Sequence, residues 1–376
     1  MPLVRYEPPA RQIVMYGDPV SQMLPKALSE LWSRQTILVT NMTSAAAESY
    51  VQSFQEILSD AYSERLSDRA DRSAVLSVTG ALRHAGTEAM VAAGSGAAIE
   101  TAKAARVCLT NNVAVPEDFE RLRKSTTAAS PRPYLIAIPT TLSGEEYLPF
   151  AVIEDKETGG LQPVQHTDLA PDIVLLDPHA TLTTPESEWL ASGMASVVNA
   201  IETGGNTLGE RPLAKAAALH GLTLLTKGLR RSRTHPLDTD ARLMCQKGAW
   251  LATQGLAQGA LPGPCHRIGR VLSSVTGLPR GLVSAVILPH VLRQSGGTAE
   301  SQAELVAAME LSDNPLDQVV AELLLDLGLP SSLSDCGVKS EALSDAIDFF
   351  SEPENAGDFA QRPSADFVNA VLDAAY

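Results

Sequence analysis

Two short segments place small and hydroxyl-bearing residues where they could bind a phosphate group. Gly94, Ser95 and Gly96 stand between an apolar, strand-like run and a helix-like segment. Glycines let the backbone approach a ligand, and the first turn of the following helix offers free N–H groups and the positive end of the helix dipole. A second loop follows the next strand-like run and contains Thr140, Thr141, Ser143 and Gly144. Ligands of open α/β sheets bind at the ends of such neighbouring strands, so the two loops together predict a phosphate-containing ligand, although the first loop alone could be a simple tight turn.

Further along the chain, one amide interrupts an apolar helical stripe. Asn199 lies four residues after Ala195, on the same helical face, in the segment GMASVVNAIE. Arginines also gather in two groups, which are Arg230, Arg231 and Arg233, and then Arg267, Arg270, Arg280 and Arg293. Both groups are consistent with solvated surface charge, but the second group could also hold an anionic substrate within an acidic protein.

The overall composition excludes several classes of partner. The formal net charge is −15, whereas a protein that binds nucleic acid needs a basic surface. No apolar run approaches the roughly 20 residues of a membrane span, and residues 1–17 lack the pattern of a signal peptide. We therefore expect a cytoplasmic protein that contacts neither nucleic acid nor a membrane. The four cysteines show no CxxC spacing, which favours free thiols over a zinc ribbon or disulfides.

The elements that must position these residues differ between the two halves of the chain. Strand-like apolar runs cover residues 11–17, 35–40, 88–96, 134–141 and 172–178. Helix-like segments between them cover residues 21–31, 47–66 and 97–109. This alternation predicts a mostly parallel, doubly wound α/β sheet.

After about residue 180 the segments become long and helical. The predicted helices cover residues 185–205, 211–230, 238–256, 263–276, 281–296, 301–311 and 315–327. We therefore divide the chain near Pro178, into an α/β domain over residues 1–178 and an all-helical domain over residues 179–376; the family resemblance described next implies that the first is a Rossmann-like dinucleotide-binding domain.

Five segments in this order resemble the iron-containing (group III) alcohol dehydrogenase superfamily, and most closely its maleylacetate reductase branch. They are GSGAAIETAK, PTTLSGEEYLPFAVIEDKETG, PDIVLLDP, SGMASVVNAIE and CHRIGRVLSSVTGLPRGLVSAVILPHVLR. The resemblance implies the dehydroquinate synthase-like fold of that superfamily, in which an α/β Rossmann-like domain precedes an all-α domain. It also implies a cleft between the domains, an oxidoreductase activity and a homodimer.

The resemblance also implies that the metal site of the family is lost here. The family holds a divalent metal with one aspartate and three histidines, and these positions fall on Ala195, Asn199, His266 and Arg280. A methyl group cannot bind a metal, an amide oxygen is a weak ligand and a guanidinium repels a cation. One imidazole does not make a site, so we expect no catalytic metal. A further family histidine, linked to proton relay, falls on Arg270.

The same comparison leaves nucleotide binding open. Ser95 and Ala97 stand where the family has glycine and serine, Glu100 stands at an aspartate position, and Leu161 replaces a lysine expected to contact the ribose. Asn41 stands where an acidic residue would grip the ribose 2′-hydroxyl and favour NAD over NADP. Either a site tolerant of both NAD and NADP is retained, or dinucleotide binding is lost. For a retained site, the expected contacts are Asn41, Gly94, Ser95, Gly96, Thr140, Thr141, Ser143 and Glu146.

Three functional hypotheses follow. The first is a metal-independent NAD(P)-dependent oxidoreductase that reduces a carbonyl or enone of a small anionic substrate. His266 would donate the proton, while Asn199, Arg270 and Arg280 stabilise negative charge. The second is a repurposed isomerase, cyclase or decarboxylase that uses neither metal nor nucleotide, and the third is a catalytically silent homologue.

Simpler structural roles also remain for three of these residues. His266 could be a structural histidine bonded to Asn199. Arg280 could pair with Glu202 or another acid. Glu146 could be an exposed loop acid.

Overall fold

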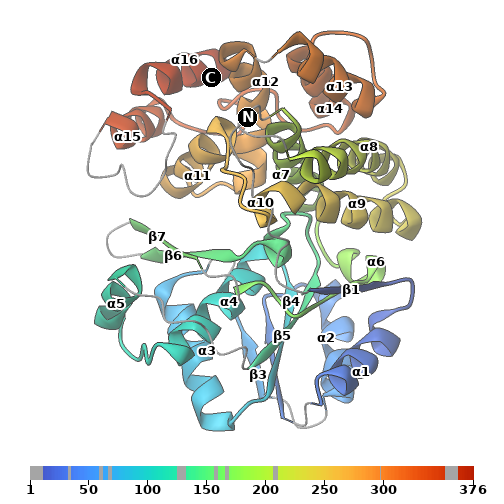
Figure 1. Ribbon diagram of the computed structural model, residues 1–376, viewed down its shortest axis with the longest axis vertical. Coiled ribbons are helices and arrows are strands. Elements are labelled where there is room, and N and C mark those ends of the chain that lie inside the picture. The colour runs from blue at the N-terminus through green and yellow to red at the C-terminus, as the bar shows by residue number, and fades with distance from the viewer. Residues whose placement is uncertain are drawn as a thin grey trace. The chain divides into compact units, whose positions relative to one another are not determined.

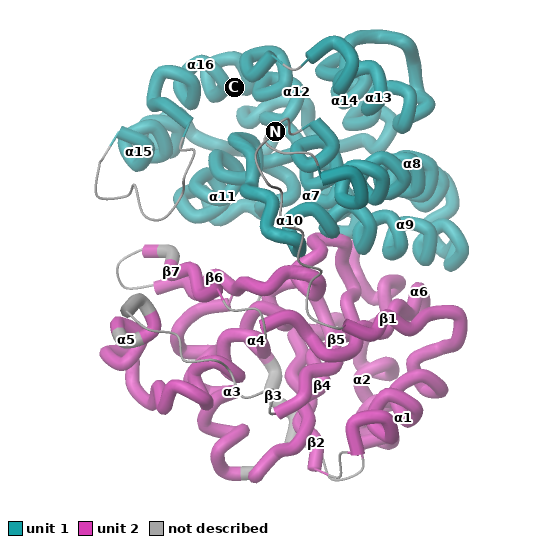
Figure 2. The backbone as a smooth tube through the Cα atoms, in the orientation of Figure 1, with its two compact units in different colours: residues 1–6, 186–376 teal, residues 7–185 magenta. Residues whose placement is uncertain are grey.

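The chain folds into two compact units. The computed structural model describes residues 12–32, 35–58, 62–66, 70–124, 133–155, 160–165, 169–205, 211–296, 298–351 and 363–376. The described residues up to Pro185 form one unit, and those from Glu186 onward belong to the other (Figure 2). The predicted boundary near Pro178 lies seven residues earlier, so that the short helix α6 (Pro178–Thr181) clusters with the first unit.

The first unit is built on a six-stranded sheet (Figure 1). Every strand pairing in it is parallel, and the strand order is β1-β8-β5-β4-β2-β3. The strands are β1 (Ile13–Tyr16), β2 (Thr36–Thr40), β3 (Tyr62–Arg65), β4 (Ala89–Gly94), β5 (Tyr134–Pro139) and β8 (Ile173–Leu176). The helices of this unit are α1 (Val20–Glu30), α2 (Ala45–Ile57), α3 (Arg72–Ala85), α4 (Gly96–Thr110), α5 (Phe119–Lys124) and α6, with single 3₁₀ turns at η1 (Pro116–Asp118) and η2 (Glu145–Tyr147). The predicted doubly wound α/β sheet is therefore confirmed.

Apolar residues on both faces of the strands explain why this sheet is covered on both sides. One face presents Leu38, Val91, Ile136 and Ile173 to a core that includes buried residues of α1 and α2. Their strand neighbours, such as Ile37 and Met90, are also fully buried and point to the opposite face because side chains alternate along a strand. The helices α3 and α4 pack against each other, outside the α1–α2 core.

The order of the strands creates a switch point between β2 and β4. From β2 the chain moves through α2 to the edge strand β3, whereas from β4 it moves through α4 to β5 in the opposite direction. In open α/β sheets, ligands bind at such a point, outside the carboxyl ends of the strands. Asn41 directly follows β2, Gly94 ends β4 and Ser95 directly follows it, so both loops lie at this switch point.

The second unit is helical throughout its described secondary structure. Its helices are α7 (Glu186–Gly204), α8 (Pro212–Thr234), α9 (Thr239–Ala252), α10 (Gln254–Ala257), α11 (Pro264–Thr276), α12 (Arg280–Ser295), α13 (Ala299–Met309), α14 (Leu316–Asp326), α15 (Ser340–Ser351) and α16 (Ala365–Ala375). Glycines let α8 and α9 approach closely, since a Cβ atom on Gly221 would lie 2.9 Å from the carbonyl oxygen of Gly248. No helix in the described ranges is long and apolar enough to cross a membrane.

One predicted helix is wrong in its second part, and one hairpin was not predicted. The helix predicted over residues 47–66 ends at Ile57, and Tyr62–Arg65 instead forms β3, which pairs with β2. The antiparallel hairpin of β6 (Phe150–Asp155) and β7 (Gly160–Gln165) is absent from the prediction. In both cases, pairing with another strand determines the structure, whereas the prediction relied on the local residue pattern.

Candidate functional site

The loop between β4 and α4 is held by the side chain of Asn41. The Ser95 N–H donates to Asn41 Oδ1 at 3.0 Å, and Asn41 Nδ2 donates to Ser95 Oγ at 2.7 Å. Gly94 has a φ of +143°, and a Cβ atom there would collide with Asn41 Oδ1. Glycine is thus required at Gly94 both by the backbone conformation and by the approach of Asn41.

The first turn of α4 retains unused hydrogen-bond donors. Ser95 is the N-cap, and its carbonyl accepts from the N–H groups of Ala98 and Ile99 at 3.1 and 3.4 Å, but its hydroxyl makes no capping bond. Within the described residues, the N–H groups of Gly96 and Ala97 make no hydrogen bond. These N–H groups, at the positive end of a 15-residue helix, form an arrangement that suits a phosphate group.

The second predicted loop lies against the first. The Thr140 N–H donates to the carbonyl of Gly94 at 2.9 Å, while the Thr184 hydroxyl donates to the carbonyl of Thr140 at 2.9 Å. A Cβ atom on Gly96 would lie 2.5 Å from Ser143 Oγ, so the Ser143 hydroxyl reaches the start of α4. The Ser143 Oγ is buried and has no hydrogen-bond partner among the described residues. Thr141, beside Thr140, is also buried.

Glu146 is buried rather than exposed, so its alternative assignment as an exposed loop acid is wrong. Only 2 % of its surface is accessible, and the loss of hydration raises the pKa of its carboxyl to about 8, with repulsion from Glu145 adding to the rise. Its backbone carbonyl accepts from Gln12 Nε2 at 2.8 Å. At neutral pH the Glu146 carboxyl is therefore mostly protonated and able to donate a hydrogen bond.

Lys103, which the site prediction missed, binds the backbone of the same loop. Its fully buried ammonium donates to the carbonyls of Glu145, Leu148 and Phe150 at 2.7, 3.2 and 2.5 Å. Burial lowers the pKa of Lys103, whereas Glu145 opposes that change. The Lys103 ammonium thus holds the 3₁₀ turn η2 in place through backbone carbonyls of the loop, and these bonds do not involve the loop's side chains.

In the helical unit, one face of α7 carries the predicted polar site. Ala195, Asn199 and Glu202 project from the same face because their spacing follows the helical repeat. The Asn199 side chain is only 3 % exposed, and no hydrogen bond joins it to another described residue. The alternative of a structural bond between His266 and Asn199 is therefore not observed. Its amide can offer both a donor and an acceptor to a polar ligand.

Glu202 connects that face of α7 to the start of α11. Its carboxylate accepts from the backbone N–H groups of Gly263, Cys265 and His266 at 3.1, 2.7 and 3.4 Å. Loss of hydration raises the pKa of Glu202 to about 7, although these hydrogen bonds and Arg267 oppose the rise. His266, which is 7 % exposed, is therefore held beside α7 through its backbone.

The two other predicted catalytic residues lie on α11 and α12. Arg270 follows His266 by one helical turn and is partly buried. Arg280 is the first residue of α12 and is also partly buried. Next to it, Gly281 lies so close to α7 that a Cβ atom would collide with the carbonyl of Ala191. Both ends of the polar face of α7 are thus contacted, by the start of α12 and by the start of α11.

The donor set of this region does not fit a divalent metal. The positions that the resemblance assigns to metal ligands hold a methyl group, an amide, one imidazole and a guanidinium, at Ala195, Asn199, His266 and Arg280. Across the described ranges, no group of three or more His, Cys, Asp or Glu side chains could hold a metal ion.

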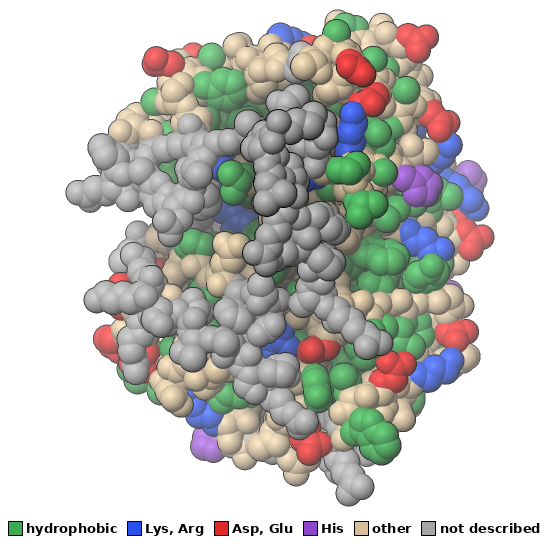
Figure 3. All heavy atoms as spheres, viewed as in Figure 1, with side chains coloured by type: hydrophobic (Ala, Val, Ile, Leu, Met, Phe, Trp, Pro, Cys, Tyr) green, Lys and Arg blue, Asp and Glu red, His purple; other side chains and the backbone are tan. Residues whose placement is uncertain are grey.

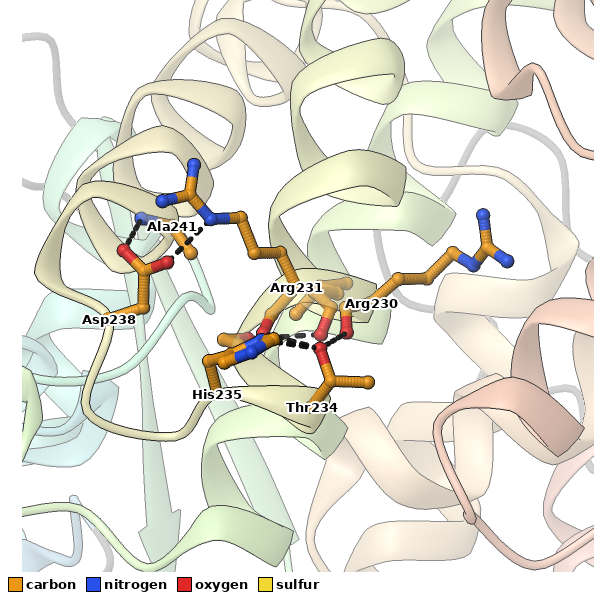
Figure 4. A network of polar contacts seen from close by, with 8 residues as sticks. Arg230, Arg231, Thr234, His235, Asp238 and Ala241 are labelled. Atoms are coloured by element: carbon orange, nitrogen blue, oxygen red, sulfur yellow. Dashed lines mark hydrogen bonds and ion pairs between the residues drawn. The ribbon is translucent and has the colours of Figure 1, made fainter.

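The first arginine group forms surface ion pairs. Arg230 pairs with Asp326, and Arg233 pairs with Glu186. In Figure 4 the Arg231 side chain points toward Asp238, with a separation of 2.5 Å between Nε and Oδ2. On the face drawn in Figure 3, acidic and basic side chains are interspersed. These three arginines are therefore surface charges, as expected from the sequence.

The second arginine group is divided. Arg293 is exposed and pairs with Asp317 at 2.8 Å, so it belongs to the surface. Arg267 is buried and donates from Nε to the carbonyl of Pro262 at 3.0 Å.

Comparisons with known proteins match both units of the chain to one protein family. The family described as iron-containing alcohol dehydrogenase matches residues 11–178, and its C-terminal counterpart matches residues 189–376. The chain is 26 % identical over 264 residues to the probable alcohol dehydrogenase EutG of Escherichia coli, an alignment that covers 69 % of this chain and 65 % of that relative.

Two solved structures have the same fold over nearly their whole length. A sulfoacetaldehyde reductase from Bifidobacterium kashiwanohense, solved with NAD+, gives a TM-score of 0.83 at 18 % identity and covers 99 % of both chains. A maleylacetate reductase from Agrobacterium tumefaciens gives a TM-score of 0.78 at 20 % identity, covering 100 % of this chain and 99 % of the other. At such identities the likeness shows the fold alone.

Proposed function

Because the chain belongs to the iron-containing alcohol dehydrogenase family, we propose that it is a NAD(P)-dependent oxidoreductase that works without a metal ion. Its substrate is a small anionic molecule with a carbonyl or enone group, as for a maleylacetate reductase. Family membership supports the oxidoreductase class, and the departures of this chain at the metal-ligand positions support the absence of a metal.

The start of α4 is the observation that carries the proposal. The N–H groups of Gly96 and Ala97 have no partner among the described residues, and they lie at the switch point of a parallel sheet. Ser143 reaches this helix start and Thr140 binds the Gly94 carbonyl just before it, and these two residues would supply hydroxyl groups together with Thr141. This set of residues would hold the diphosphate of a dinucleotide, whose reduced nicotinamide supplies the hydride.

The helical unit would supply the remaining groups of the reaction. As hydride adds to a carbonyl carbon, negative charge develops on the oxygen, and the Asn199 amide N–H would stabilise it by a hydrogen bond. His266 would then donate a proton to that oxygen and complete the alcohol. With an enone, hydride adds to the β-carbon and the proton goes to the α-carbon, which leaves a saturated ketone.

The two arginines would determine the preference for an anion. Arg270 and Arg280 replace two histidines of the family pattern by permanent cations that can bind a carboxylate in a bidentate manner. They would also provide part of the charge stabilisation that a metal ion gives in relatives. A substrate without a negative charge should therefore react poorly.

Spectroscopy of the purified protein tests this proposal. NADH and NADPH are each mixed with the protein, and their fluorescence is recorded. Their oxidation is then followed with 4-oxo-2-pentenoate and, as a neutral control, with its methyl ester, in the presence of a chelator. We expect binding and oxidation that favours the carboxylate. If neither nucleotide binds, the non-redox isomerase, cyclase or decarboxylase becomes the better assignment.

A further inference from the structure

Asn41 joins the two strands that flank the switch point of the sheet. It follows β2, whereas its two hydrogen-bond partners, the N–H and Oγ of Ser95, follow β4. These neighbouring strands are paired in parallel, with Thr40 opposite Ala93. The Asn41 amide therefore fixes the phosphate-binding loop to the adjacent strand, at the place where we expected it to contact a ribose.

The two bonds also determine how the Ser95 hydroxyl is oriented. An N–H group can only donate, so the Asn41 atom that faces the Ser95 N–H must be the amide oxygen. The other end of the amide is then the NH₂ group, which donates to Ser95 Oγ at 2.7 Å. Because Ser95 Oγ accepts this bond, its own proton points elsewhere, and no capping bond within α4 uses it.

We propose that the two hydrogen bonds between Asn41 and Ser95, which we call the clasp, orient the Ser95 hydroxyl proton toward the diphosphate of a bound nucleotide. The N–H groups of Gly96 and Ala97 would donate to the same diphosphate. Asn41 is thus a positioning residue that acts through Ser95, and it does not distinguish NADH from NADPH. The dinucleotide itself rests on the proposed function, whereas the orientation of the donors rests on the contacts of Asn41.

The residues around Asn41 also provide no charge that would discriminate between NADH and NADPH. Residues 36–44, which form β2 and the following loop, contain no charged side chain. This segment therefore offers neither a carboxylate that would repel a 2′-phosphate nor a cation that would attract one. We expect the dissociation constants of NADH and NADPH to agree within about tenfold.

The isosteric variant Asn41→Asp separates this proposal from direct recognition of the ribose. A carboxylate can accept from both the N–H and the hydroxyl of Ser95, so the clasp would close but the hydroxyl proton would turn inward. Diphosphate binding would then weaken for every nucleotide. If Asn41 instead read the ribose, the same change should tighten NADH and weaken NADPH.

The experiment measures dissociation constants for ADP, NADH and NADPH by calorimetry. The variants are Asn41→Asp, Ser95→Ala and the double variant, with Asn111→Ala at the other end of α4 as a matched control. We expect Asn41→Asp to weaken all three ligands by about tenfold or more at constant ratio, and Ser95→Ala to weaken them by about threefold to tenfold. In the Ser95→Ala background, Asn41→Asp should weaken nucleotide affinity by less than about threefold because the Ser95 hydroxyl is absent.

Several results would overturn the clasp. One is tighter binding of NADH to the Asn41→Asp variant, and another is unchanged affinity for all three ligands. A third is that Asn41→Asp weakens binding as much in the Ser95→Ala background as in the wild type, which would mean that the added negative charge acts by itself. Failure of the proposed function gives a different result, in which ADP binds and responds to the variants but no carbonyl or enone is reduced. A wild-type protein that binds none of the three ligands would overturn both.

Discussion

The carboxylate of Glu202 lies 2.7 Å from the backbone nitrogen of Cys265 and accepts its hydrogen bond. Through this bond and two longer ones, a residue near the end of α7 caps the first turn of α11. Gly263 makes the approach possible, because a Cβ atom there would collide with the carboxyl group. His266 lies in the capped turn, so its position depends on a side chain 64 residues earlier in the chain.

Replacing Glu202 should therefore reduce both stability and turnover. In Glu202→Ala three N–H groups lose their acceptor, and we expect a loss of about 3 kcal/mol in the free energy of unfolding. Glu202→Gln keeps one acceptor oxygen and should lose about 1 kcal/mol. Urea denaturation measures both values, with Glu300→Ala in the exposed first turn of α13 as the control. Equal stability of Glu202→Ala and the wild type would contradict the capping role.

The buried carboxyl of Glu146 should make stability depend on pH. Its folded-state pKa is raised to about 8 from 4.5, so the folded protein binds the proton more tightly than the unfolded chain. The stability that this group contributes is complete below pH 4.5 and is lost as the pH rises toward 8. We expect this loss to reach up to about 4 kcal/mol.

Glu146→Gln, which mimics the protonated form, should remove this dependence. Unfolding free energies of both proteins are measured by urea denaturation between about pH 5 and pH 8. The wild type should lose more stability over this range than the variant does, while other titrating groups cancel in the difference. Parallel curves would show that the Glu146 carboxyl is not held in its protonated form.

Gly94 should be indispensable for nucleotide binding. In Gly94→Ala the new methyl group would collide with Asn41, and the φ of +143° would be strained. We expect nucleotide affinity to fall by at least about a hundredfold, together with a loss of about 2 kcal/mol in stability. Gly80→Ala is the control, since a Cβ atom there meets open space on helix α3. That variant should bind normally and gain up to about 1 kcal/mol from helix propensity.

A metal site should return when the lost ligands are restored. The triple variant Ala195→Asp, Asn199→His and Arg280→His, together with His266, contains one carboxylate and three imidazoles. We expect it to bind Zn²⁺ stoichiometrically in calorimetry. The same variant with His266→Ala should bind much more weakly, by about tenfold to a hundredfold. If the wild type binds Zn²⁺ as tightly as the triple variant, the comparison of ligand positions is wrong.

The long elements could be predicted from the sequence because their patterns are strong. The periodic segment around Ile268 and Leu272 predicts a helix over residues 263–276, and α11 covers Pro264–Thr276. The apolar run before Asn41 likewise predicts β2. Tyr62–Arg65 is different, because this short edge strand is identified only by its pairing with β2.

Contacts over long sequence separations explain what the sequence did not reveal about the site. The bonds between Asn41 and Ser95 span 54 residues, and those from Lys103 to the loop after β5 and to the start of β6 span 42 to 47 residues. A lysine in an apolar helix is visible in the sequence, but its carbonyl partners are not. Asn41 was expected as a cofactor contact because the family resemblance places a ribose-binding residue at its position, and only its bonds to Ser95 indicate a positioning role.

The central claim is a reduction that depends on NAD(P)H and on no metal ion. Iron and zinc content and NAD(P)H-dependent turnover of an anionic enone are therefore measured on the same purified sample, before and after exhaustive chelation. The account predicts substoichiometric metal and turnover that chelation leaves unchanged. One iron or zinc ion per chain, whose removal abolishes turnover and whose return restores it, would contradict the account.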